Sequence, residues 1–77
     1  MTNFKPTNDW HIKINGHEHG IPHVHVEFRD GSRVVVSIKT REVLAGKVTP
    51  PSRIAPALEN IKANENVYLN EFMRLNP

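Results

Sequence analysis

The fold is decided by residues 23–38, which read HVHVEFRDGSRVVVSI. Apolar and polar side chains alternate in the first half of this stretch, and the second half is rich in β-branched residues. A period-two pattern on both sides of Asp30-Gly31 predicts two antiparallel strands. His23 and His25 then point away from the core. The inward side chains are expected to be Val24, Val26, Phe28, Val34, Val36 and Ile38.

The register of this strand pair follows from its turn, because a slip of one residue would exchange the two faces of a strand. A two-residue turn would place Val26 opposite Val35 and mix core positions with solvent positions. A type I turn followed by Gly31 in the left-handed position of a bulge places Val26 opposite Val34 instead. We predict this second register, which also sets His25 beside Val35.

The segments on either side of the pair predict the rest of the domain. Residues 10–14 alternate in the same way and predict a strand, whereas the polar residues 1–9 predict a flexible N-terminal arm. Residues 43–48 predict a short fourth strand or a bent edge. Two apolar stripes at helical spacing come next. They are formed by Ile54, Leu58 and Ile61, and by Tyr68, Phe72 and Leu75.

The predicted fold class is α+β, with a single domain over residues 10–77. It consists of a three- to four-stranded, mainly antiparallel sheet followed by two C-terminal helices. Both helices need an apolar surface to cover, and the inward face of the sheet is the only one that the pattern offers. We therefore expect the helices on one face and the histidines on the other.

Composition excludes several classes of protein. The chain has no cysteine, which removes disulfides, thiolate metal ligands and a cysteine nucleophile. It also lacks a glycine-rich phosphate loop and a Gly-x-Ser-x-Gly motif. No export signal and no long apolar run occur, so a cytoplasmic location without membrane contact is expected. A net charge of +2 is too small to argue nucleic-acid binding by itself.

Four of the five histidines lie within residues 16–25, which read GHEHGIPHVH. Side chains at i and i+2 of a strand share a face about 7 Å apart, so His23 and His25 can converge on one small ion or phosphate. His19 can fold back from the preceding loop to complete a three-histidine set, an open arrangement known for zinc. Glu18 would be a fourth ligand or an orienting residue. His17 is a less favoured substitute for His19.

The residues alone leave three uses of this cluster open. In the first, the imidazoles are surface groups, or they cap loop carbonyls and hold the turn at Pro22. In the second they bind a metal ion, and in the third they serve acid–base chemistry or ligand binding. His11 lies one strand away on the same outward face and belongs to the same region under any of these uses.

Residues 18–25 resemble the signature of DUF4160, a small bacterial family of unknown function. That signature has an acidic residue, a histidine, two variable positions that often end in proline, and then His-x-His. Ile21 departs from it, because family members commonly carry a second proline there. Residues 44–48, LAGKV, are similar to the family's Leu-x-Gly segment, and the likeness extends from Trp10 onward. Beyond Tyr68 only the pattern matches.

The resemblance implies the predicted fold and the grouping of the three histidines, but no established activity. Such families are regarded as candidate members of toxin–antitoxin pairs. The likeness therefore implies a small, RNA-directed protein, with RNA or an antitoxin-like protein as its partner. In an RNA-cleaving toxin, His23, His25 and His19 are the candidate acid–base residues, and Arg33 or Lys39 would bind the phosphate.

Two alternatives belong to other classes of function. One is a transition-metal module that binds one ion, such as zinc, through His19, His23 and His25. The other is a non-enzymatic interaction domain that docks a protein on the outward face of the sheet, where Val35 lies beside His25. Metal content separates the first alternative from the nuclease, and association behaviour separates the second.

Overall fold

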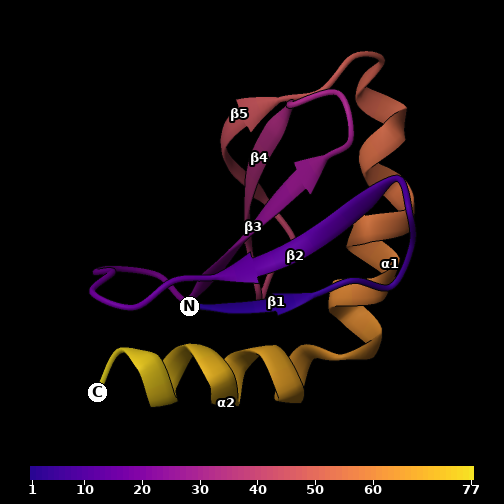
Figure 1. Cartoon of the computed structure of the whole chain (residues 1–77). Helices are drawn as coiled ribbons and strands as arrows, with labels where there is room; N and C mark the ends of the chain where they lie inside the picture. The colour runs from indigo at the N-terminus through magenta and orange to yellow at the C-terminus, as the bar shows by residue number, and fades with distance from the viewer.

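The computed structural model describes all residues, 1–77, as a five-stranded antiparallel sheet followed by helices (Figure 1). The strands lie in the order β1-β2-β3-β4-β5, so every strand pairs with its neighbour in sequence. The elements are β1 (Thr2–Phe4), β2 (Trp10–Ile14), β3 (His23–Phe28), β4 (Arg33–Ser37), β5 (Val43–Lys47), the 3₁₀ helix η1 (Pro51–Ile54), α1 (Ala55–Ala63) and α2 (Glu65–Leu75). The predicted α+β class and the two C-terminal helices are confirmed, while the sheet has one strand more than expected.

The additional strand is β1, which lies inside the segment expected to be an arm. It pairs with β2 and places Thr2 opposite Ile14 and Phe4 opposite Ile12. Its side chains also contact α2, since the Phe4 ring packs edge-on against Tyr68 at a centroid distance of 4.9 Å. A strand of three residues carries too little alternation to be read from sequence, and contacts with a distant helix stabilise this one.

The predicted register of β3 and β4 is confirmed. Val26 lies opposite Val34, and His25 lies opposite Val35. Gly31 has a φ of 91°, the left-handed conformation that the bulged turn requires. Its amide donates to the carbonyl of Phe28 over 3.0 Å. The turn therefore sets which side chains of β3 face the core and which face outward.

The core lies between one face of the sheet and the two helices. Fourteen buried apolar residues form a single cluster, in which the inward positions of β2, β3 and β4 meet Ala57 and Ile61 of α1 and Tyr68 and Phe72 of α2. In Figure 1, α1 runs along the right side of the sheet and α2 along its lower edge. The helices thus share one face, as expected, and the outward face carries the polar side chains of β2, β3 and β4.

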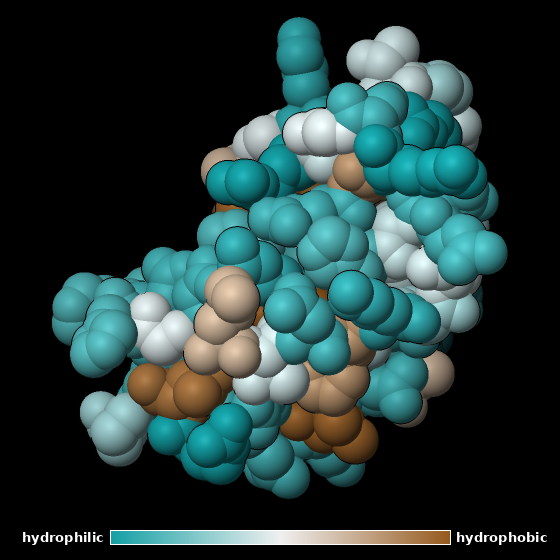
Figure 2. Space-filling model, in the orientation of Figure 1, coloured by the Kyte–Doolittle hydropathy of each residue, from teal (hydrophilic) through white to brown (hydrophobic).

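The surface is mostly hydrophilic in the orientation of Figure 1, with a few separate apolar patches near α2 along the lower edge (Figure 2). Val67 and Met73 of α2 are among the exposed large apolar residues. No helix has the length and apolar character that crossing a membrane requires.

Candidate metal centre

The histidines of β3 meet at the start of that strand. Buried and half-buried residues alternate along β3, which puts His23 and His25 on the face opposite the core. Their rings lie 5.4 Å apart between centroids, at an interplanar angle of 69°. The convergence expected from the i, i+2 spacing is therefore present.

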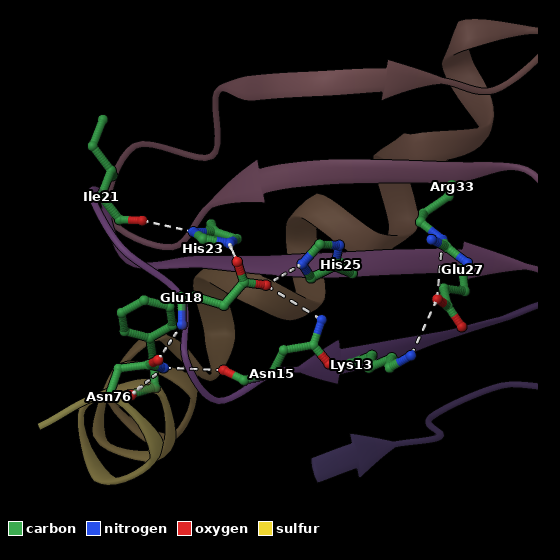
Figure 3. A network of polar contacts seen from close by, with 10 residues as sticks. Lys13, Asn15, Glu18, Ile21, His23, His25, Glu27, Arg33 and Asn76 are labelled. Carbon is green, nitrogen blue, oxygen red and sulfur yellow. Dashed lines mark hydrogen bonds and ion pairs between the residues drawn. The ribbon is translucent and has the colours of Figure 1, made fainter. Parts of the chain in front are cut away.

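These rings are more covered than the sequence suggested. Their side chains are only 11% and 17% exposed, for His23 and His25 respectively. Figure 3 shows the loop before β3 folded over the strand, with Glu18 pointing at both rings. Phe72 of α2 lies on another side of His23, at a centroid distance of 5.4 Å. The expectation of an open face is thus wrong at this end of the sheet, because a loop and a helix side chain screen it.

Glu18 joins the two histidines. Its Oε1 lies 3.0 Å from Nε2 of His25, and its Oε2 lies 3.5 Å from Nε2 of His23. One donor atom from each residue falls within 4.8 Å of the other two. The loop brings Glu18 into this position by two left-handed residues, His17 with a φ of 60° and Gly20 with a φ of 89°.

The contacts of the His23 ring determine which of its two nitrogens carries a hydrogen. Its Nδ1 lies 2.8 Å from the carbonyl oxygen of Ile21, which only accepts, so Nδ1 carries the hydrogen. In a neutral ring the lone pair of Nε2 then faces a carboxylate oxygen of Glu18. Two facing lone pairs repel unless a cation, a proton or a metal ion, lies between them. A backbone carbonyl behind the ring is also the usual outer partner of a metal-ligating histidine.

The pKa of the Glu18 carboxyl is held below its ordinary value, first of all by the hydrogen bond with His25. A hydrogen bond from Asn15 and the charges of both histidines act in the same direction, while burial opposes them. The carboxylate is therefore ionised at neutral pH, the state in which it binds a cation.

The fold should lose stability in acid, because several carboxyl groups have lowered pKa values when folded. Glu18 is one, and hydrogen bonds from Arg74 and Thr2 lower the pKa of Glu71 to about 2. A carboxyl with a lowered folded pKa contributes stability above its unfolded pKa of about 4.3, and that contribution is lost as the pH falls toward the folded value. Urea unfolding midpoints should therefore decrease between about pH 5 and pH 2. A midpoint that stays constant over this range would contradict the assignment, and Glu71→Gln should flatten part of the decrease.

The remaining loop histidines lie outside this group of three. His19 is exposed and is not among the residues whose donor atoms converge. With His17 it lines a hollow of about 670 Å³ between the loop and the end of α2, where Phe72 and Met73 form part of the other wall. Glu18 thus occupies the place that the sequence assigned to His19. The acidic residue just before His19 was the available signal, but spacing alone does not tell which of the two turns inward.

A second polar cluster surrounds Glu27, farther along the outward face (Figure 3). Oε1 of Glu27 lies 3.0 Å from His11 Nε2, and Oε2 lies 3.1 Å from Arg33 Nε and 3.9 Å from Lys13 Nζ. Arg33, one of the two expected phosphate-binding residues, is therefore paired with Glu27 rather than with the histidines of β3. Lys39, the other, is exposed in the turn after β4.

The fold and this donor set define a small α+β domain with a candidate Glu–His–His centre on the outward face of its sheet. A family model described as Domain of unknown function (DUF4160) matches residues 10–72. Since the match spans most of the chain, the protein belongs to this family, and the predicted family is confirmed. No curated protein and no solved structure matches this chain.

Proposed function

We propose that this protein is a metal-binding module in which Glu18, His23 and His25 hold one transition-metal ion, zinc being the ion that fits best. The observation that carries the proposal is the convergence of one carboxylate and two imidazole donors within 4.8 Å. Two histidines and a glutamate are the protein ligands of a well-known class of open zinc sites, which keep a fourth position for water or substrate. Magnesium fits less well, because it prefers oxygen ligands.

The distances between donors support the proposal. With zinc bonds of about 2.0–2.2 Å, two corners of a tetrahedral site lie about 3.3 Å apart. The Glu18 oxygens lie 3.0 Å from His25 Nε2 and 3.5 Å from His23 Nε2, on either side of that value. An ion would also remove the repulsion between Glu18 and the Nε2 lone pair of His23. When bound, it would supply a Lewis acid and a water whose pKa is lowered toward about 7.

Metal content of the untagged protein tests the proposal. Equilibrium dialysis against zinc should give one ion per chain, and His25→Ala should lose this ion because a ligand is gone. His11→Ala is the matched control, since His11 lies on the same face but contacts Glu27. A wild-type protein that takes up no zinc, or a His25→Ala variant that takes up as much as wild type, would rule the proposal out.

A ribonuclease of a toxin–antitoxin pair stays a prediction that uses the same residues. The close rings of His23 and His25 favour acid–base chemistry. Arg33 pairs with Glu27, and Lys39 is exposed in the turn after β4. A phosphate-binding role for either residue beside the histidines therefore gains no support from these contacts. Cleavage of RNA that persists in EDTA and disappears in His25→Ala would favour this function over the metal module.

A protein-interaction role also stays a prediction, and the sheet offers two places for it. Val35, beside His25 on the outward face, is only half-buried. All five residues of β5 are exposed, and its outer edge is unpaired. Edge strands with exposed apolar side chains are common sites of strand addition. An antitoxin-like protein is one partner that such a surface would accept.

A further inference from the structure

Asn76, the residue that follows α2, ties the end of this helix to the loop that carries Glu18. Its Oδ1 accepts a hydrogen bond of 2.6 Å from the backbone amide of Glu18. Its Nδ2 donates to the carbonyl of Asn15 over 3.0 Å and to the carbonyl of Phe72 over 2.9 Å. Both ends of the side-chain amide are therefore used, and they join two segments that are 58 residues apart in sequence (Figure 3).

These bonds hold Glu18 from one side while Asn15 holds it from the other. Asn76 fixes the backbone of Glu18, and Asn15 Nδ2 donates to Oε1 of its carboxylate over 3.3 Å. The same helix end supports the second ligand, because the Phe72 ring packs against His23. Phe72 is itself anchored in the core, with 4% of its surface exposed. The end of α2 thus contacts two of the three residues of the centre.

We propose that Asn76 is a positioning residue of the metal centre, and that docking of the α2 end and metal binding are thermodynamically coupled. The inference rests on the proposed function. Without Asn76, the loop would be less ordered before metal binds, and ordering it would oppose binding. Coupling of this kind is reciprocal, so a bound ion must in turn strengthen the attachment of the helix end. A ligand that displaces this end would therefore weaken metal binding.

Asn76 lies beyond the residues that the family model matches, which end at Phe72. The matched region thus contains the three proposed ligands and Phe72, whereas Asn76, which binds the loop, lies outside it. A chain that shares residues 10–72 but ends differently would keep the three donors and lose Asn76. We expect such a chain to bind the ion more weakly.

The zinc affinities of wild-type protein and Asn76→Ala, measured by competition with a fluorescent chelator, test the coupling. Loss of an outer partner of a metal site typically costs about 10–100-fold in affinity, and we expect a loss in that range at unchanged stoichiometry. Asn70→Ala, an exposed asparagine of the same helix, should bind as wild type does. Asn76→Asp keeps an acceptor for the Glu18 amide and loses the donor to Asn15. Its zinc affinity should therefore lie between those of wild-type protein and Asn76→Ala.

Amide hydrogen exchange provides the second readout. In wild-type protein, zinc should slow exchange of the Glu18 amide, whose hydrogen bond to Asn76 closes the loop. In Asn76→Ala this amide should exchange rapidly with or without zinc, while circular dichroism shows the variant to be folded. If the wild-type protein binds zinc and Asn76→Ala binds it with the same affinity, the coupling is wrong but the proposed function is not. A wild-type protein that binds no zinc overturns both the coupling and the proposed function.

Discussion

Replacing Glu18 by glutamine is expected to lower the affinity for zinc by more than about 100-fold, because loss of an outer partner alone costs about 10–100-fold and Glu18 is a proposed ligand. Glutamine keeps the size and one carbonyl oxygen of the side chain but removes its negative charge. That charge is what faces the two Nε2 atoms, at 3.0 and 3.5 Å. Isothermal titration with zinc measures the change.

The matched control is Glu27→Gln, which makes the same substitution on the same face of the sheet. Glu27 contacts His11, Lys13 and Arg33 but neither histidine of the centre. Its replacement should therefore leave the zinc affinity within about 2-fold of wild type. That is the usual size of the effect when the replaced residue makes no contact with the site. Equal losses in the two variants would mean that general surface charge, and not Glu18, governs binding.

Replacing Gly46 by alanine is expected to destabilise the fold by about 2–5 kcal/mol, the sum of a left-handed backbone penalty and a steric clash. Gly46 lies in β5 with a φ of 79°, and a Cβ there would come within 2.2 Å of the carbonyl oxygen of Arg33. The colliding atom belongs to the backbone of β4, so it cannot rotate away. Urea unfolding measures the loss.

Gly31→Ala separates the two contributions to this loss. Gly31 has a φ of 91°, but a Cβ added there would meet no atom within 4 Å. Only the backbone penalty applies, so the loss should be about 1–2 kcal/mol. Similar losses in Gly31→Ala and Gly46→Ala would show that the close approach to Arg33 does not matter. The comparison also tests why this strand carries glycine in its Leu-x-Gly segment.

The sequence predicts well those elements whose apolar and polar residues follow a regular local period. Alternation along residues 23–38 and a glycine at the bulge determine the register of β3 and β4, and with it the shared face of His23 and His25. The two helices followed from apolar spacing in the same way. By contrast, β1 has only three residues and is stabilised by Phe4 packing on Tyr68, a contact that no local pattern encodes.

The candidate centre was predictable only in part, for a related reason. The spacing of His23 and His25 placed them together, but the third donor depends on how an irregular loop turns. That turn uses left-handed residues at His17 and Gly20 and a hydrogen bond to Asn76. Since none of these is visible in the motif, sequence reasoning favoured His19 over Glu18. The place of Arg33 beside Glu27 follows from the predicted register, because these two residues lie opposite each other on β4 and β3.

The proposed function depends on a metal ion, and not protons alone, joining Glu18 to the rings of His23 and His25. Glu18 and the two rings could instead be joined by protons alone, as an imidazolium and a carboxylate. That arrangement would keep the contacts at 3.0 and 3.5 Å without any ion. The two states differ in what lies on Nε2 of His23 and His25, and nitrogen NMR of the imidazole rings reports this directly.

The most direct measurement is a zinc titration of the untagged protein followed by ¹⁵N signals of its histidine rings. We predict that Nε2 of His23 and of His25 shift together and saturate at one equivalent of zinc, that magnesium has no effect, and that the ring of His11 stays unchanged. Rings of His23 and His25 that ignore zinc, or that respond no more than the exposed rings of His17 and His19, would contradict a metal centre built on Glu18.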